Sequence, residues 1–588
     1  MIGSINIDAI ETYSKVANVR YDMALIKISN NKKRQLTTMA EQAIGLAGQG
    51  RFASALKLCD RADRLHRDFV SIMYVRGIAA ELQQDHATAC EWLGRACAAA
   101  PGRLQFQLNY ATCLMLNKQD KEAAAIFPRI LEQDPGLFEL GDGYSSYGSV
   151  LDNLGEYRRA LQITHQAMRA NPDNDFFLNR AAGIHAKLLE LDTALALSEK
   201  VRARNPDDVE QSLTSAAFLI QLGRSDEMHE LLHSALRIDP GLVKALTMLL
   251  FSGNYDGREE DAARLRSLYE TAERGSTEHI NATFLLGSEA NRKGQYAEAF
   301  NYWLEGNSQQ RSLIDYDEEE QETLFHTAMA SFPASRLSGV ISSEASQAAP
   351  IFIVGMPRCG STLLERSLTR HPALKTAGEN DSLPRAIIGR MNNQLSLRTI
   401  IENLGSFDNN GLLAVGREYA RRISDEYGIK DRVIDKSLNN FIYAGLIAMT
   451  LPNARIIHTM RNPMATCLSM FETHFVGGIS YVYDLDELGR QYARYQKLMQ
   501  YWREVLPSGV MIEASYENLV SNTEPELRRI LKACNLEWHD DCLSPHKAKG
   551  GVNTASSVQV RKPIHQQSVS RWKHYEEQLA PLKQYLQP

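Results

Sequence analysis

Residues 350–362 read PIFIVGMPRCGST, and this stretch decides the fold of the C-terminal half. An apolar, strand-like run is followed by a turn that contains Gly355 and Gly360, and then by two hydroxyl residues, Ser361 and Thr362. An amphipathic helical segment, residues 363–370, comes next. The pattern predicts a phosphate-binding loop, in which backbone N–H groups at the start of a helix point at an anion.

Position 361 distinguishes this loop from the ATP-binding pattern GxxxxGK[ST]. Ser361 stands where that pattern has its lysine, which serves the β- and γ-phosphates of a nucleoside triphosphate. The missing lysine argues against hydrolysis of ATP or GTP. We therefore expect a nucleotide phosphate that is not a triphosphate.

The composition is that of a soluble protein large enough for at least two domains, with 588 residues, 44% apolar and 23% charged. No apolar run approaches the roughly 18–20 residues that span a bilayer, and residues 1–31 mix charges with apolar side chains, unlike a signal peptide. The eight cysteines form no CxxC pair and no metal-ligand spacing with histidine. We expect a cytoplasmic protein with no membrane span and no metal.

The net charge of −6 divides unevenly along the chain. From Ile351 onward there are 29 Lys+Arg against 24 Asp+Glu, and the remainder has 36 against 47. The half with the loop is thus the basic one, which suits an anionic ligand. A concentrated basic stripe is missing, so we expect no nucleic-acid partner.

The N-terminal half repeats with a period of about 34 residues. Its alanine and proline markers are Ala55, Ala89, Ala123, Ala160 and Ala194, with Pro101, Pro135, Pro172, Pro206 and Pro240. This spacing resembles the tetratricopeptide repeat, a helix–turn–helix unit. The small residue allows two helices to approach closely, a glycine turn joins them, and we expect the proline to open the next helix.

About six or seven repeats fit between residues 36 and 305. One interval of 37 residues predicts a longer loop after Pro135, and Met228 replaces the small residue in a degenerate repeat. Such solenoids present a groove to a protein or peptide; the alternative is that the array only scaffolds or dimerises the rest, and the oligomeric state is open. The predicted domains are an array at 36–305, a helix and linker at 306–349 and a second domain at 350–588.

Further strands are predicted at 432–435, 454–460 and 509–513, separated by helical stretches. This alternation favours a parallel sheet with helices on both faces. In such sheets ligands bind outside the carboxyl ends of the strands. Arg358, Lys436 and Arg461 each fall just past the end of a predicted strand, and so predict a site for several anionic groups.

Several motifs after residue 350 together resemble the sulfotransferases that use 3′-phosphoadenylyl sulfate (PAPS), above all the tyrosylprotein sulfotransferases and bacterial relatives fused to tetratricopeptide repeats. The motifs are Pro357 to Thr362, His371-Pro372, Gly378-Glu379, Asp435-Lys436, Arg461-Asn462-Pro463 with Ser469, and Tyr516 to Leu519. The resemblance runs from Ile351 to the C-terminus. It implies a multidomain fold, an all-α repeat solenoid followed by an α/β, P-loop-like sulfotransferase domain with a parallel sheet.

The resemblance also implies how PAPS is held. Its 5′ group falls to the loop residues Arg358, Cys359, Gly360, Ser361 and Thr362. The 3′-phosphate falls to Arg461 and Ser469, whose spacing of eight residues places them on one helical face. Tyr516 matches a residue near the adenine, and Arg561 and Lys562 match a closing basic segment.

Sulfuryl transfer needs a base for the acceptor proton and positive charge at the leaving oxygen. By resemblance Glu379 is the base, and Lys436 with Arg358 steadies the transferring group; Ser556 or Ser557 could assist Lys436. The acceptor is open between protein tyrosine, a saccharide and a small-molecule hydroxyl.

The sequence argues against two rival functions. A P-loop kinase-like phosphotransferase predicts a lysine at position 361 and a carboxylate for magnesium, and the sequence has neither in the expected place. A catalytically silent repeat adaptor would be favoured by loss of Arg358 or Glu379, and both are present.

Overall fold

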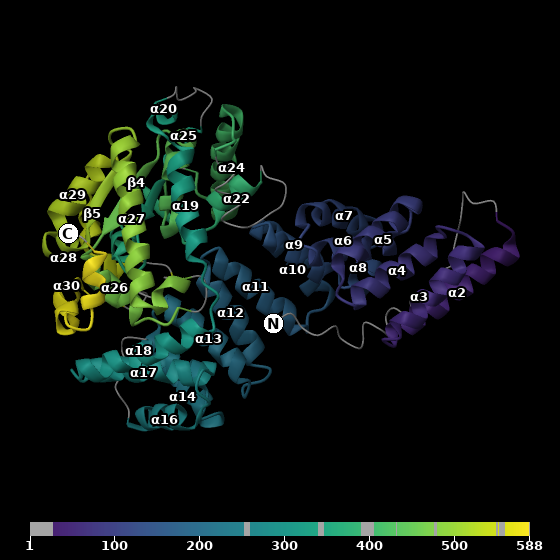
Figure 1. Ribbon diagram of the computed structural model, residues 1–588, viewed down its shortest axis with the longest axis horizontal. Coiled ribbons are helices and arrows are strands. Elements are labelled where there is room, and N and C mark those ends of the chain that lie inside the picture. Colours follow the sequence, from purple (N-terminus) through teal and green to yellow (C-terminus); the bar gives the residue numbers. More distant parts are fainter. Residues whose placement is uncertain are drawn as a thin grey trace. The chain divides into compact units, whose positions relative to one another are not determined.

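The computed structural model describes residues 28–251, 259–338, 346–389, 405–430, 432–475, 479–548, 551, 559–561 and 563–586. The chain divides into two compact units, one up to Ile184 and one from His185 onward. This division falls within the repeat array, inside helix α11 (Asp175–Lys187) (Figure 1). The predicted domain bounds therefore stay a prediction. None of the helices in these ranges is both long and apolar enough to cross a membrane.

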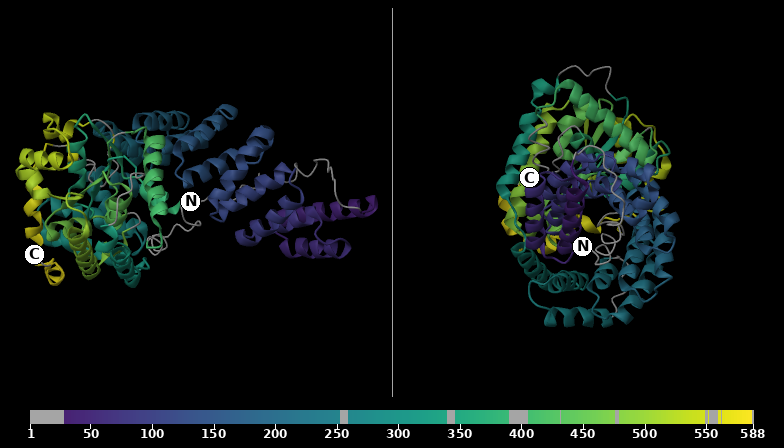
Figure 2. Two further views of the ribbon diagram at one scale, coloured as in Figure 1. Left: turned by 90° about the horizontal axis from the view of Figure 1, so that it is seen from above. Right: turned by 90° about the vertical axis from the view of Figure 1, so that its right-hand side faces the viewer.

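The first unit consists of helices that run side by side in succession (Figure 2). They are α2 (Asn30–Gly48), α3 (Phe52–Leu65), α4 (Val70–Leu82), α5 (His86–Ala99), α6 (Leu104–Leu116), α7 (Asp120–Gln133), α8 (Pro135–Leu140), α9 (Gly143–Asn153), α10 (Tyr157–Ala170) and the start of α11. The repeated alanines Ala55, Ala89, Ala123 and Ala160 are 0% exposed, as close helix packing requires. The predicted helical repeat fold is confirmed.

Two details of the array differ from the expectation. Pro135 opens α8 at its first turn, but Pro101, Pro172, Pro206 and Pro240 lie in turns before the next helix. After Pro206, the side chain of Asp208 caps α13 by accepting from the backbone N–H of Gln211. The longer connection predicted after Pro135 is partly helical, because it includes α8. This helix buries Phe138 in the array core.

Where the structure describes the connecting turn, a residue with left-handed backbone joins the two helices of a repeat. The turn residues are Gly50, Gln84, Lys118, Gly155, Leu189, Gly223 and Gly294, with φ between 59° and 77°. Glycine adopts this conformation without steric cost, whereas a residue with a Cβ atom is destabilised in it. Leu189 is the bulky apolar member of the series.

The second unit continues the array and then forms the sheet. Its first helices are α12 (Leu191–Arg202), α13 (Val209–Leu222), α14 (Ser225–Ile238), α15 (Val243–Phe251), α16 (Glu259–Thr271), α17 (Thr277–Arg292), α18 (Tyr296–Ser312), α19 (Glu318–Ser331) and α20 (Ala334–Leu337). Met228 of the degenerate repeat is fully buried in α14. Helix α18 continues past residue 305, where the array was expected to end.

The sheet has five parallel strands in the order β2-β3-β1-β4-β5. They are β1 (Ile351–Val354), β2 (Leu374–Gly378), β3 (Arg432–Asp435), β4 (Arg455–Met460) and β5 (Met511–Ser515). The predicted parallel sheet is confirmed, and β2 was not predicted. Phe352 and Val354 enter one apolar core while Ile351 and Ile353 enter another, so both faces of the sheet are covered.

The helices of this domain follow or precede the strands (Figure 1). They are α21 (Ser361–Leu368), α22 (Ser382–Ile388), α24 (Asn409–Tyr427), α25 (Ala444–Thr450), α26 (Pro463–Phe471), α27 (Leu485–Val505), α28 (Tyr516–Ser521), α29 (Thr523–Ala533) and α30 (Gln567–Ser570), with short 3₁₀ turns at Leu438–Tyr443, Ser480–Tyr483, Asp540–Leu543, Pro545–Lys547, Gln559–Arg561, Arg571–Tyr575 and Ala580–Gln584.

The helix pair α17–α18 shares its core with the sheet domain. The buried Asn307 side chain donates to the backbone oxygens of Trp303, at 2.7 Å, and Phe471, at 2.8 Å. Phe300 stacks on Phe471, with ring centroids 5.5 Å apart. Tyr296 stacks on His574 of the C-terminal segment, with ring centroids 4.3 Å apart. The end of the array is thus packed into the domain that carries the loop.

Candidate functional site

The glycine loop between β1 and α21 is held against β4 and α28. Gly355 has φ of 153°, and a Cβ there would lie 2.7 Å from the backbone oxygen of Thr459. Gly360 has φ of 96°, and a Cβ there would overlap the ring of Tyr516. Both positions therefore require glycine, one for a close strand approach and one for the aromatic ring.

The loop ends at the first turn of α21. Gly360 is the N-cap residue and brings no capping side chain, and the N–H groups of Leu363 and Leu364 donate to its oxygen. Ser361 and Thr362 open the helix and are buried. The arrangement fits the expected anion cradle at a helix N-terminus.

Cys359 lies in the loop as a packing residue. Its Sγ is 2.8 Å from Oγ1 of Thr459, and Thr459 donates in turn to the backbone oxygen of Val354. Burial raises the pKa of the Cys359 thiol, which keeps it protonated. We therefore assign this cysteine a supporting role in the loop.

Four residues predicted to bind the nucleotide lie together at the carboxyl ends of β1, β4 and β5. Arg358, in left-handed backbone at φ of 67°, donates through Nε to Oγ of Ser469 at 3.1 Å. Arg461 donates through Nη1 to the backbone oxygen of Arg358 at 3.0 Å. The guanidinium carbon of Arg461 lies 4.9 Å from the centre of the Tyr516 ring, a cation–π distance. Two arginines, a serine and an aromatic ring thus share one corner.

A third arginine was missed by the sequence reasoning. Arg571, in the 3₁₀ turn after α30, pairs through two nitrogens with the carboxylate of Glu472 at the end of α26. Burial lowers the pKa of Arg358 and of Arg461, and the positive charge of Arg571 lowers both further. The signal available in the sequence was the basic run of the last thirty residues, which includes Arg571 and Lys573.

The corner also contains an unused hydrogen-bond donor. Nη2 of Arg461 donates to the backbone oxygen of Ser568 at 2.7 Å, but its Nε is buried with no hydrogen-bond partner in the part of the chain that the structure describes. A buried donor without an acceptor costs free energy. An anion placed between these guanidiniums would remove that cost.

The candidate catalytic pair lies at the ends of the neighbouring strands β2 and β3. Nζ of Lys436, 1% exposed, donates to Oε1 of Glu379, whose side chain is 47% exposed. The backbone N–H of Lys436 donates to the oxygen of Gly378 at 3.0 Å, which holds the two strand ends together. Glu379 thus pairs with a buried cation while about half of its own side chain stays exposed to solvent.

A second carboxylate faces Lys436, and the sequence reasoning missed it too. Oε2 of Glu365, on α21, is 3.9 Å from Nζ, and Oγ1 of Thr376 donates to its other oxygen at 2.6 Å. Burial raises the pKa of Glu365, and the charge of Lys436 opposes that rise. Its position on the helix that follows the glycine loop was the available signal, but only the fold turns it toward β3.

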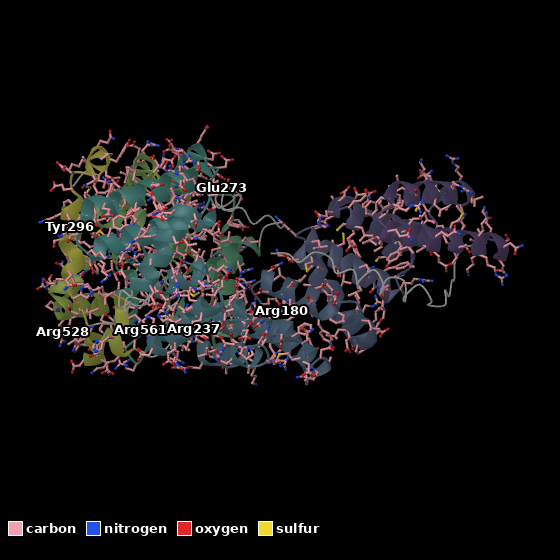
Figure 3. All side chains as sticks on the ribbon, turned by 90° about the horizontal axis from the view of Figure 1, so that it is seen from below. Arg180, Arg237, Glu273, Tyr296, Arg528 and Arg561 are labelled. Carbon is pink, nitrogen blue, oxygen red and sulfur yellow. The ribbon has the colours of Figure 1, made fainter. Side chains whose placement is uncertain are left out.

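The remaining predicted residues lie at the C-terminal segment. Arg561 donates through Nη2 to the backbone oxygen of Gln221 at the end of α13, so its guanidinium contacts the array (Figure 3). Lys562, Ser556 and Ser557 lie outside the described residues. Over the ranges that are described, no three or more His, Cys, Asp or Glu side chains gather as a metal site.

Comparison with known proteins agrees with the resemblance read from the motifs. Residues 350–540 match the model of the sulfotransferase family. A protein of Aquifex aeolicus described as uncharacterised is 28% identical over 377 residues, which cover 63% of this chain and 49% of that protein. Protein-tyrosine sulfotransferase 1 of Danio rerio is 24% identical over 255 residues, covering 38% of this chain and 65% of that protein.

This chain therefore spans about half the length of the first relative and under two thirds of the second. Among solved structures, the sulfotransferase domain of the Synechococcus PCC 7002 olefin synthase is similar at 17% identity and a TM-score of 0.29, over 42% of this chain and 99% of that domain. The predicted resemblance to tyrosylprotein sulfotransferases is confirmed.

Proposed function

We propose that this protein is a sulfotransferase that moves a sulfuryl group from PAPS to an acceptor hydroxyl. The observation that carries the proposal is the corner formed by Arg358, Arg461, Ser469 and Tyr516 beside the glycine loop. The family match over residues 350–540 supports it.

The corner fits a nucleotide with two separate anionic groups. The start of α21, with Ser361 and Thr362, would hold the 5′ group together with Arg358. Arg461 and Ser469 would hold the 3′-phosphate, and the partnerless Nε of Arg461 offers it a further donor. Bound there, PAPS supplies the sulfuryl group and a phosphate leaving group.

Glu379 and Lys436 suit the two proton and charge duties of the transfer. The exposed carboxylate of Glu379 accepts the proton of the acceptor hydroxyl as its oxygen forms the new bond to sulfur. Lys436, buried and positively charged, stabilises negative charge that develops on the leaving oxygen. Their ion pair in the free protein keeps both charges ready without leaving a buried cation unpaired.

Protein tyrosine is the acceptor that the relatives suggest, since several are protein-tyrosine sulfotransferases. The repeat array would then bind the protein or peptide that carries the tyrosine. No metal enters this scheme.

Calorimetry with adenosine 3′,5′-bisphosphate and with ATP tests the proposal without a known acceptor. We expect the bisphosphate to bind more tightly than ATP to the wild-type protein, and Arg461→Ala to weaken it at least tenfold. Arg528→Ala is the matched control, because that guanidinium stacks on Trp538 and pairs with Glu524 on α29. Preference for ATP, or equal loss in both variants, would overturn the proposal.

A further inference from the structure

The turn between α11 and α12 contains a leucine in an unfavourable conformation. Leu189 has φ of 62°, at the place where Gly155 and Gly223 occupy the adjoining turns. A leucine there costs free energy that a glycine would not. Polar residues occupy the position in two earlier turns, so the turn itself does not require an apolar side chain.

The side chain of Leu189 lies on the strand end that leads to the proposed base. A Cβ added to Gly378 would be 3.6 Å from both Cδ atoms of Leu189, an ordinary van der Waals contact. Gly378 is followed directly by Glu379, and its own φ of 62° turns the chain at that point. Leu189 is partly exposed, so some of its apolar surface faces away from this contact.

Neighbouring residues of the array make similar contacts with the same domain. Leu191, 2% exposed, packs so tightly on Gly551 that a Cβ at Gly551 would overlap it. One turn further along the array, Gln221 accepts from Arg561. All these residues belong to the unit that starts at His185. Two successive turns of the array therefore contact the domain around the site.

We propose that Leu189 is a specificity-determining residue that forms an apolar wall of the acceptor subsite. The inference rests on the function proposed above, in which an acceptor hydroxyl approaches the exposed carboxylate of Glu379. An apolar side chain packed against Gly378, the residue before Glu379, favours an acceptor with an apolar face next to its hydroxyl, as in a phenol, over a saccharide. The array thereby contributes to the choice of acceptor within the site itself.

The test compares Leu189→Gly with Lys118→Gly, which makes the same backbone change in a turn of the first unit. The probes are N-acetyl-tyrosine amide and methyl glucoside, with PAPS as donor. We expect the wild type to prefer the tyrosine derivative, and Leu189→Gly to raise its KM about tenfold with kcat within twofold. The control should match the wild type, and Leu189→Gly should unfold at the same or a higher temperature, because glycine relieves the turn.

A second readout avoids dependence on turnover. Calorimetric binding of N-acetyl-tyrosine amide to the protein saturated with adenosine 3′,5′-bisphosphate should weaken by the same factor in Leu189→Gly. An unchanged KM and affinity, a preference for the glucoside, or no binding or transfer of the tyrosine derivative in a wild type that binds the bisphosphate would overturn the inference. A wild type that does not bind the bisphosphate would instead overturn the proposed function.

Discussion

The guanidinium of Arg571 pairs with both oxygens of Glu472 and lies near Arg358 and Arg461. The positive charge of Arg571 and the negative charge of Glu472 both act on Arg358 and Arg461. In the binding mode proposed above, a phosphate between Arg358 and Arg461 would supply the negative charge that Glu472 supplies in the free protein. The ion pair would then compete with the nucleotide.

Removing either partner should change nucleotide affinity in opposite directions. Arg571→Ala should weaken adenosine 3′,5′-bisphosphate binding about 10- to 100-fold, because a charged donor is lost and Glu472 is left to repel the phosphate. Glu472→Gln should strengthen it severalfold. Calorimetry at two salt concentrations checks both, with Arg528→Ala as the control arginine; parallel changes in the two variants would contradict the competition.

The contact between Gly360 and Tyr516 predicts a site-specific effect of a single methyl group. Gly360→Ala should displace the Tyr516 ring and weaken bisphosphate binding by about 100-fold, since both the loop and the ring move. Gly509→Ala is the matched control, with φ of 81° and open space around its Cβ. It carries the backbone strain alone and should lower stability by about 1 kcal/mol while leaving affinity intact.

Loss of the proposed base should separate binding from transfer. Glu379→Gln should lower sulfuryl transfer by about 10²- to 10⁴-fold, the usual worth of a positioned base. The affinity for adenosine 3′,5′-bisphosphate should stay within a few fold, because Glu379 pairs with Lys436 and not with the arginine corner. Initial rates with PAPS and calorimetry on the same preparation measure both, and full activity in this variant would assign the base elsewhere.

The buried carboxyl of Asp435 should make the folded protein less stable as the pH rises through the acidic range. Burial raises the pKa of this carboxyl from 3.8 to about 6, against the hydrogen bonds from Ser437 and Tyr419. The native state thus binds the proton more tightly than the unfolded state, so the contribution is full below about pH 4 and is lost as the pH rises to about 6. The difference is on the order of 3 kcal/mol.

Calorimetric unfolding of the wild type and of Asp435→Asn between pH 4 and pH 7 measures this effect. The unfolding temperature of the variant should depend less on pH across that window. The pKa of Glu513 is lowered to about 2, mainly by the nearby His458, so its stabilisation is lost as the pH falls from about 4.5 towards 2 and overlaps only the lower end of the window. Both proteins contain Glu513, so the difference between their profiles reports Asp435. Parallel pH profiles would exclude Asp435 as the titrating group.

Because the buried amide of Asn307 bonds across to Phe471, we expect helices α17 and α18 to unfold together with the sheet domain. Asn307→Leu leaves the oxygen of Phe471 without its donor and should cost about 1 to 3 kcal/mol. We expect the unfolding transition of the sheet domain to shift with that of α17–α18. Asn291→Leu, which removes the hydrogen bond from Tyr575, is a comparison at a less buried position; a shift confined to array helices would contradict the shared core.

The strands that carry the site were predictable where apolar runs marked them. Residues 351–354, 432–435 and 455–460 each contain an apolar core, and a cation follows each strand within four residues, which placed Arg358, Lys436 and Arg461 at one edge of the sheet. Strand β2 was not predicted because its sequence, LKTAG, contains no apolar run, and its side chains are buried irregularly. A strand this short, with mixed side chains, gives too little periodicity to be recognised from sequence.

The residues that sequence reasoning missed act through tertiary contacts. Glu365 reads as an ordinary polar position of an amphipathic helix, and only the packing of α21 on the sheet brings it to Lys436. Arg571 lies 110 residues beyond Arg461 in the chain and meets it through the path of the C-terminal segment. Leu189 occupies a turn position that recurs from repeat to repeat, so the sequence pattern alone does not single it out.

The packing of α17 and α18 into the sheet domain has a consequence for ancestry. Interfaces between separately folded domains are usually more polar than a core, whereas here Trp303, Phe300 and Asn307 are buried against Phe471 and Tyr575. Recombination at the end of the repeats would expose that surface on both fragments. Lineages that exchange arrays should therefore keep this helix pair with the sheet domain and vary the repeats before it.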